Sequence, residues 1–372
     1  MALKIRKREE PWKWGALVTF LGALLFSLAL CSLLLAATGK SWGQGLVVLW
    51  EGTFGSGWAL EEALLKAVPI YLCSLGVAVA FRMQIWNIGA EGQYALGAIG
   101  STWMAMTFPD LPGVVLLPLM LAMALVFGAV WAMVPALLRL KLKVNEIIST
   151  LMLNYIAILL LDYLVMRVWK HHSGFPMTPD FPSGALLGTV FGRVHWGIVI
   201  CVACGVLVWA FMRFTRLGYE LRASGEGPRV ARYAKLPYGF LVMFVMGVSG
   251  WLAGWAGAVE VSAVVGRLQP AIIVGYGYTA IVVAWLARLH PLSIAVAAFL
   301  LAVLRVGAEN LQIELQVPAA YGVILEGVLL LTVLAGQFFQ TYTLERTRPG
   351  AEEGENGGPN VGANENVKEG AA

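Results

Sequence analysis

Long runs of apolar residues without charge alternate with short polar segments along most of the chain. A helix needs about 20 apolar residues to cross a bilayer. Ten uncharged or nearly uncharged runs approach or reach this length, at 15–38, 67–81, 92–109, 113–138, 147–166, 194–212, 236–259, 268–287, 289–304 and 315–339. We therefore predict an all-α polytopic membrane protein with about ten transmembrane helices.

Composition supports a membrane protein, and the distribution of charge predicts its orientation in the membrane. Of the 372 residues, 59% are hydrophobic and 13% are charged, whereas soluble domains carry about 25% charged residues. Ten spans put both termini on one side, and that side holds 19 Lys and Arg residues against 7 on the other. Because Lys and Arg accumulate in cytoplasmic loops, we predict a cell-membrane protein with both termini in the cytoplasm. The net charge of +4 then reflects topology and gives no reason to expect binding to nucleic acid.

The same pattern divides the chain into three parts. Residues 1–14 form a basic cytoplasmic start, and residues 15–340 form the membrane domain. Residues 341–372 are rich in Gly, Glu and Asn, a composition typical of disorder. Within the membrane domain, the loops at 39–66 and 167–195 are predicted to face outward.

The loop at 213–238, RFTRLGYELRASGEGPRVARYAKLPY, is the most basic part of the chain. Its pattern predicts a short helix with Ser224 or Gly225 as the N-cap. Pro228 suits the first turn of such a helix and Arg232 suits its last turn. A folded element where a simple turn would suffice indicates a docking site for another protein. The alternative is a basic loop that only sets topology and touches lipid headgroups.

The stretch FRMQIWNIGAEGQYALGAIGS, residues 81–101, places polar side chains and glycines among apolar residues. Asn87, Glu91 and Gln93 are costly near lipid unless they face protein or water. Irregular backbone at membrane depth is tolerated where it lines a cavity. The stretch is therefore either a broken helix beside a pore or an ordinary cytoplasmic turn between two spans.

Further polar and small residues lie inside the predicted spans. Asn154 either binds a polar ligand or holds helices together, and Glu326 either has a transport role or makes a hydrogen bond within the bundle. Gly250, Gly254 and Gly257 form a small-residue face suited to close helix packing.

Motifs for catalysis, ATP binding or metal binding are weak or missing. Gly39-Lys40-Ser41 ends like a phosphate-binding loop, but Leu34 stands where that motif requires Gly. Cys201 and Cys204 lie mid-span without a second pair, and the histidines of the 167–195 loop lack metal-ligand spacing. We expect a transport subunit that is not an enzyme, with no metal and no cofactor, so any ATP hydrolysis belongs to a separate subunit.

Three ordered blocks resemble the bacterial ABC-importer permeases for nucleosides and simple sugars. The blocks are NIGAEGQ at 87–93, LGYELRASGEGPRVARYAKL at 217–236 and GYGYTAIVVAWLARLHPL at 275–292. The second is similar to the family's cytoplasmic coupling segment, although Gly227 stands where the family often has Asn and Lys235 where it often has Gly.

The resemblance implies a type II importer permease fold and a set of partners. These partners are a second permease subunit, identical or homologous, a cytoplasmic ABC ATPase and an extracytoplasmic substrate-binding lipoprotein, in addition to membrane lipid. It also implies a nucleoside substrate, with simple sugars next. A branched-chain amino acid is the alternative substrate, because related permeases carry such amino acids.

Site residues follow from the polar pattern and the resemblance together. Pore or substrate-binding candidates are Trp86, Asn87, Glu91, Gln93, Asn154, Tyr276, Tyr278 and Glu326. The ATPase-coupling residues are expected on a helix from Gly225 to Tyr233 and its flank, namely Arg222, Gly225, Glu226, Pro228, Ala231, Arg232 and Tyr233.

Two other function classes compete with the permease. An ion-coupled secondary transporter would use intramembrane acids such as Glu91 and Glu326 and often shows internal repeats, but the two halves of the chain show no convincing repeat. A membrane-embedded enzyme would need a catalytic constellation, and none is evident in the sequence.

Overall fold

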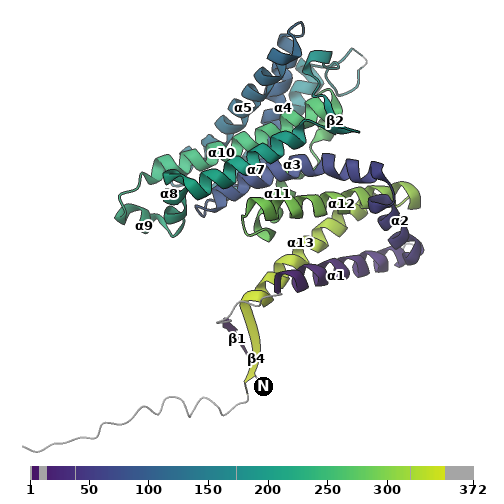
Figure 1. Cartoon of the computed structure of the whole chain (residues 1–372), viewed down its shortest axis with the longest axis vertical. Coiled ribbons are helices and arrows are strands. Elements are labelled where there is room, and N and C mark those ends of the chain that lie inside the picture. The colour runs from purple at the N-terminus through teal and green to yellow at the C-terminus, as the bar shows by residue number, and fades with distance from the viewer. Residues whose placement is uncertain (1, 8–14, 38, 173, 319, 348–372) are drawn as a thin grey trace, which may run out of the picture. The chain divides into compact units, whose positions relative to one another are not determined.

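The structure is a computed structural model that describes residues 2–7, 15–37, 39–172, 174–318 and 320–347 (Figure 1). The described residues are mainly helical, with two small two-stranded sheets. The chain divides into two compact units, residues 1–29 with 328–372 and residues 30–327.

The larger unit holds most of the helices. After α1 (Gly15–Ala37), which begins in the smaller unit, come α2 (Trp42–Phe54), α3 (Gly57–Phe81), α4 (Ala90–Thr107), α5 (Gly113–Leu142), α6 (Glu146–Tyr163), α7 (Gly197–Phe214), α8 (Arg216–Gly225), α9 (Pro228–Tyr233), α10 (Tyr238–Val259), α11 (Tyr276–Leu286), α12 (Pro291–Leu315) and α13 (Ala320–Thr341), which ends in the smaller unit. Short π-helical turns extend α6 over Leu164–Val168 and α10 over Glu260–Val265, and short 3-10 turns occupy Ser183–Ala185 and Pro270–Ile272. A hairpin of β2 (Thr189–Phe191) and β3 (Val194–His195) lies in the loop before α7.

The smaller unit contains a two-stranded sheet that the sequence pattern did not predict. Strand β1 (Ala2–Lys7) pairs antiparallel with β4 (Tyr342–Thr347), with Ala2 opposite Thr347. Residues 342–347 were assigned to a disordered tail, and this part of the assignment is wrong because the segment forms a strand. Residues 8–14 and 348–372 lie outside the described residues.

Some of the predicted spans lie on helices that are long enough to cross a membrane. Among the described residues, six helical segments are long and apolar enough to cross a bilayer, at Gly57–Phe81, Gly113–Leu142, Glu146–Val168, Gly197–Phe214, Tyr238–Val265 and Pro291–Leu315. Three shorter apolar segments lie at Leu21–Ala36, Pro270–Leu286 and Ala320–Leu329. All ten predicted runs overlap helices, but only six helical segments meet the length and hydropathy of a span over the described residues, so the count of about ten spans stays a prediction.

Helices α3 and α10 lie at the centre of the larger unit. Helix α10 packs against α3, α4 and α5, and α3 also packs against α11 and α12. In α3, 83% of the most apolar 18-residue window is buried. A helix that is apolar all round is a buried helix, and this explains why α3 carries no charged residue between Ala67 and Phe81.

Glycines allow α4, α5 and α10 to approach closely, as the small-residue pattern predicted. A Cβ atom added at Gly254 of α10 would collide with the carbonyl oxygen of Ala124 in α5, and one added at Gly257 would collide with the carbonyl oxygen of Tyr94 in α4. Close backbone approach through small residues is the usual means of helix packing in membranes.

We expect Gly254→Ala to lower the free energy of unfolding by about 1–3 kcal/mol, the usual cost of overpacking a close contact. The reason is that α5 must move to accommodate the new methyl group. Thermal stability of the detergent-solubilised protein measures the effect. The matched control is Gly327→Ala, because a Cβ atom at Gly327 meets no atom within 4 Å. Equal stability of the two variants would contradict the tight crossing.

Candidate functional site

The polar stretch NIGAEGQ begins where the backbone leaves helical geometry. Helix α3 ends at Phe81, α4 starts at Ala90, and the residues between them form turns and extended backbone. Gln84 in this connection has a positive φ of 55°, a conformation that is uncommon outside glycine. The chain therefore returns into the bundle without a helix, and its side chains must satisfy the free backbone groups.

Asn87 and Gln93 form a reciprocal pair inside the protein. The Asn87 Nδ2 donates to Gln93 Oε1 at 3.0 Å, and the Gln93 Nε2 donates to Asn87 Oδ1 at 3.0 Å. Asn87 also donates to the hydroxyl of Ser249 in α10 at 2.8 Å. Both side chains are buried. Their amide groups therefore hold the connection against α10.

Glu91 joins the N-termini of two helices. It lies in the first turn of α4, and its carboxylate accepts from the backbone N–H of Gly275 at 2.9 Å and of Gly277 at 2.6 Å, at the start of α11. Helix N-termini carry unpaired N–H groups and a partial positive charge. A buried carboxylate between two such ends satisfies the N–H groups and is stabilised by both dipoles.

Glycine is required on the α11 side of this junction. Gly275 has a φ of +88°, and a Cβ atom at Gly277 would collide with the backbone of Glu91. The block GYGYTA therefore supplies the close approach that lets Glu91 reach the N-terminus of α11.

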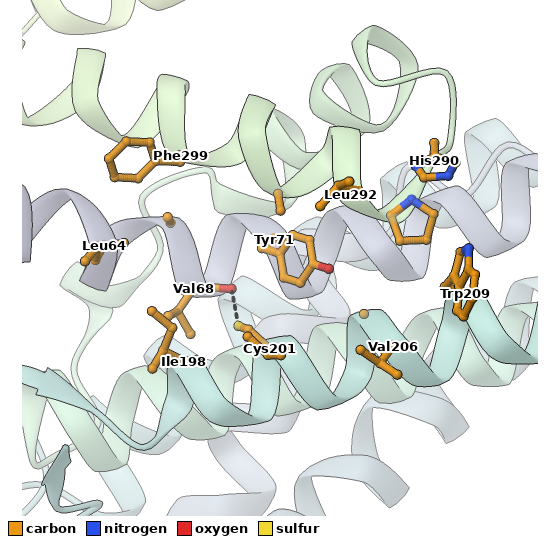
Figure 2. Close-up of a pocket in the computed structure, with 15 residues that line it drawn as sticks. Leu64, Val68, Tyr71, Ile198, Cys201, Val206, Trp209, His290, Leu292 and Phe299 are labelled. Atoms are coloured by element: carbon orange, nitrogen blue, oxygen red, sulfur yellow. Dashed lines mark hydrogen bonds between the residues drawn. The ribbon is translucent and has the colours of Figure 1, made fainter.

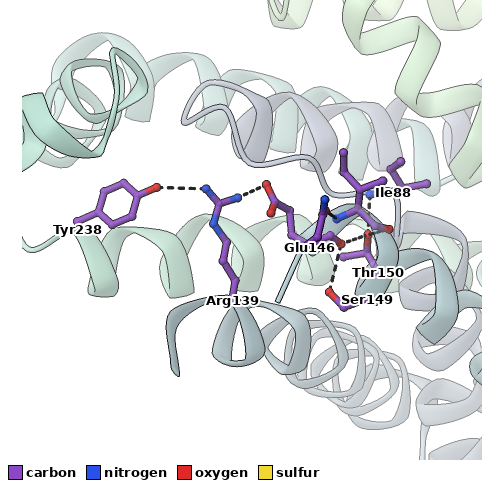
Figure 3. Close-up of polar contacts among 8 residues, drawn as sticks. Ile88, Arg139, Glu146, Ser149, Thr150 and Tyr238 are labelled. Atoms are coloured by element: carbon purple, nitrogen blue, oxygen red, sulfur yellow. Dashed lines mark hydrogen bonds and ion pairs between the residues drawn. The ribbon is translucent and has the colours of Figure 1, made fainter. Parts of the chain in front are cut away.

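Helix α6 also contributes residues to this group of polar contacts. Asn154 accepts from Gly92 N at 2.8 Å and donates to the Ile88 carbonyl oxygen at 2.7 Å. The Thr150 hydroxyl accepts from Ile88 N at 3.3 Å (Figure 3). We call the group of Asn87, Glu91, Gln93, Asn154, Thr150 and Ser249 the polar junction. It links α4, α6, α10 and α11.

A second polar contact binds α5 to α6 near the loop between them. Arg139 of α5 forms an ion pair with Glu146 in the first turn of α6 and donates to the Tyr238 hydroxyl at 3.4 Å (Figure 3). Asn145 accepts from Ile147 N at 2.8 Å and caps α6. These contacts fix the end of the bundle that carries the basic loop.

The aromatic candidates lie at the edge of the polar junction or outside it. The Tyr278 hydroxyl accepts from Asn154 Nδ2 at 3.3 Å, and 36% of the side chain is exposed. Tyr276 is buried beneath the guanidinium of Arg305, 5.0 Å from the ring centre. Trp86 is exposed and stacks on Trp285 at 5.4 Å.

Glu326 contacts a different part of α11. Its carboxylate accepts from the hydroxyl of Thr279, which follows Tyr278 in the chain. The structure therefore brings Asn87, Glu91, Gln93 and Asn154 together and leaves Trp86 and Glu326 outside that group.

The basic loop folds as two helices instead of one. Thr215 caps α8 by accepting from Gly218 N at 3.0 Å, and α8 continues through Gly225. Gly227 then adopts a φ of 131° and precedes α9. The helix predicted from Gly225 to Tyr233 is present only from Pro228, and its predicted N-cap, Ser224 or Gly225, is wrong, because α8 continues through Gly225 and Gly227 caps α9. Pro228 at the start of α9 and Arg232 in its last turn are confirmed.

The loop packs firmly against the ends of the spans. Leu221 of α8 is buried in an apolar cluster with Met83, Met212 and Leu241. A Cβ atom at Gly225 would collide with the carbonyl oxygen of Arg82. Helix α8 therefore rests directly on the connection that leads to the polar junction.

Arg82 lies at the centre of this contact. Its guanidinium donates to the Leu289 carbonyl oxygen at 2.8 Å. Burial, reinforced by the positive charge of Arg222, lowers the pKa of Arg82. Arg222 itself is exposed and lies close enough to Arg82 for the two charges to repel.

Helix α9 has one side packed against this chain and one side exposed. Ala231, predicted to pack against a partner, is buried within this chain, so it is not available for such a contact. Tyr233 is 93% exposed and Val230 is also exposed, beside the exposed Arg229 and Arg232. The exposed part of α9 therefore combines an aromatic side chain with positive charge.

The loop before α7 packs on the opposite end of α10. Phe181 N donates to the Gly266 carbonyl oxygen at 2.8 Å, and Leu187 N donates to that of Ser262 at 2.9 Å. Burial lowers the pKa of His195 to about 4, so this side chain is neutral at pH 7. Its Nδ1 accepts from Gly197 N at 3.0 Å. Among the described residues, no three His, Cys, Asp or Glu side chains form a group that could hold a metal ion.

Sequence reasoning missed several members of the junction. Ser249 binds Asn87, Gly275 and Gly277 bind Glu91, and Thr150 binds the backbone of Ile88. The only signal for the two glycines was the GYGYTA block, and Ser249 and Thr150 gave none beyond being polar residues in apolar runs.

Known proteins share this chain's sequence over most of its length. The family described as the permease component of the branched-chain amino acid transport system matches residues 59–334. The glucose ABC transporter permease protein of Haloferax volcanii is 35% identical, over 91% of this chain and 93% of that protein. The guanosine ABC transporter permease protein of Bacillus subtilis is 32% identical, over 84% and 91%. The nucleoside ABC transporter permease protein of Lactococcus lactis is 29% identical, over 78% and 83%. The chain therefore belongs to this family of ABC transporter permeases, and its resemblance to the nucleoside and simple-sugar members is confirmed.

Proposed function

We propose that this chain forms the translocation pathway of an ATP-driven importer for a nucleoside or a simple sugar. The single observation that carries the proposal is the polar junction, where α4 and α11 begin inside the bundle and meet at Glu91. Interrupted helices at membrane depth are the usual framework of a transport site. Three relatives of this chain carry glucose, guanosine and nucleosides in their names.

Within this pathway the polar junction has a positioning role. Asn87, Glu91 and Gln93 are buried, and their polar groups bind other parts of the protein. Tyr278 is hydrogen-bonded to the junction and is partly exposed. We assign Tyr278 to contact with substrate, because an aromatic ring stacks on a flat base and on the apolar face of a sugar.

Helices α8 and α9 form the docking surface for a separate ATPase. The support is the exposed Tyr233 and Val230 beside Arg229 and Arg232, since buried aromatic and Arg side chains dominate protein interfaces. Gly225 rests on Arg82, five residues before Asn87. A shift of α8 caused by ATP binding can therefore move Arg82 and, through the five residues that follow it, the polar junction.

Membership of the family supports the remaining partners, and the charge bias supports the orientation. A second permease subunit, identical or homologous, completes the pathway, and an extracytoplasmic lipoprotein delivers the substrate. Both termini and the α8–α9 loop lie in the cytoplasm, as the charge bias predicts.

Uptake of labelled compounds tests the substrate. We expect deletion of the gene to abolish uptake of guanosine or of glucose, to leave leucine uptake unchanged, and to be reversed when the gene is restored. Leucine competes poorly because its ammonium and carboxylate both need charge partners, and the carboxylate of Glu91 is already occupied by backbone N–H groups. Loss of leucine uptake alone would overturn the substrate assignment in favour of a branched-chain amino acid.

A further inference from the structure

A groove of about 600 Å³ lies between three of the span-length helices, α3, α7 and α12 (Figure 2). Its lining is almost wholly apolar and includes Val68, Tyr71, Val206, Trp209, Leu292 and Phe299. The volume is within the range of about 300–1,000 Å³ typical of small-molecule sites. The groove is separate from the polar junction, whose residues are not part of its lining.

The groove opens onto an apolar surface of the protein. Val202 and Val206 of α7 and Leu292 of α12 line it and are mostly exposed in the protein alone. A nucleoside or sugar would lose its hydrogen bonds to water in such a lining without regaining them. An apolar molecule from the bilayer is therefore the occupant that fits.

The lining of the groove argues against a helix as the occupant. Val206, Trp209 and Leu292 are bulky, exposed side chains in this lining, whereas helix packing in membranes prefers small residues.

One end of the groove suits a charged headgroup. Trp209 and His290 lie together there (Figure 2), and Trp residues favour the membrane interface. Arg213 follows Trp209 by one helical turn and is exposed. Helix α12 begins next to His290, at Pro291, and a helix N-terminus attracts negative charge.

We propose that the groove binds one acyl chain of a phospholipid from the cytoplasmic leaflet, with the phosphate beside His290 and Arg213. The leaflet follows from the predicted orientation, in which Arg213 is cytoplasmic. The site itself requires only that α3, α7 and α12 lie in a membrane, so it does not depend on the transported substrate.

Photo-crosslinking tests the site on the full chain in nanodiscs. The probe is a phosphatidylglycerol with a photoreactive group near the end of one acyl chain, and the adducts are mapped by mass spectrometry. We expect adducts concentrated on the groove-lining residues of α3, α7 and α12. Ala295→Phe fills the groove from α12 and should weaken binding roughly tenfold, as expected for the loss of about two buried methylene groups.

The matched control is Val296→Phe, because Val296 is exposed on the same helix and is not part of the lining. If Ala295→Phe fails to fold, Ala67→Leu fills the groove from α3 instead. Arg213→Gln should lower the preference for phosphatidylglycerol over phosphatidylcholine. Adducts spread evenly over exposed residues such as Leu159, adducts unchanged by both filling variants, or adducts concentrated on α1 or on a second protein chain would each overturn the proposal.

Discussion

Replacing Glu91 with alanine is expected to abolish transport and to destabilise the larger unit. The change leaves the N–H groups of Gly275 and Gly277 without their acceptor. Each buried polar group that loses its partner costs about 1–3 kcal/mol, so the two together cost about 2–6 kcal/mol. Thermal unfolding of the purified protein and uptake of the labelled substrate measure the two effects.

Two further variants make this result specific. Glu91→Gln keeps one acceptor oxygen and removes the charge, so we expect an intermediate loss of stability. Glu314→Ala removes an exposed carboxylate from α12 and should change neither stability nor uptake. If Glu91→Ala were as stable and active as Glu314→Ala, Glu91 would have no role in joining α4 to α11.

Replacing Tyr233 with alanine is expected to weaken ATPase binding by about 30-fold or more, since a central aromatic residue of an interface contributes about 2 kcal/mol or more. Tyr233 is 93% exposed, so the permease itself should keep its stability. Binding of the purified ATPase subunit to the permease in nanodiscs measures the change.

Tyr163→Ala is the control for the docking surface. Tyr163 is an exposed aromatic residue at the last position of α6, whose first turn lies at the Arg139–Glu146 contact. We expect the Tyr163→Ala variant to bind the ATPase with unchanged affinity. Equal affinities of the Tyr233 and Tyr163 variants would place the docking surface elsewhere than α9.

Hydropathy predicted the helices well because a lipid-facing or buried helix must be apolar over most of its length. The count of spans is harder to predict, since α4 is short and carries Glu91 and Gln93, and α11 has only 11 residues. Both helices begin inside the bundle, and an apolar run does not reveal where a helix begins relative to the membrane.

The sequence indicated only some of the residues of the polar junction. Polar residues in an apolar setting marked Asn87, Glu91 and Gln93 as unusual, but their partners Ser249, Gly275 and Gly277 lie more than 150 residues away along the chain. No local period connects such distant positions, so the sequence left open whether these side chains lie beside a pore or in a cytoplasmic turn.

The basic loop shows a similar limit on a smaller scale. Proline and basic residues located α9 correctly, whereas the break before it depends on the backbone of Gly227, with a φ of 131°. The packing of Ala231 against this chain, instead of a partner, depends on how α9 is tethered to α8 and α10. Strands β1 and β4 were missed because their pairing joins the two ends of the chain.

Transport by purified components in proteoliposomes tests most directly whether this chain is the membrane pathway of an ATP-driven importer. The permease, its permease partner, the ATPase and the binding protein are reconstituted together, and uptake of labelled guanosine or glucose is followed with ATP present or absent. We expect uptake only with ATP, and only when both this chain and the ATPase are included. Uptake driven by a proton or sodium gradient without the ATPase would contradict the account.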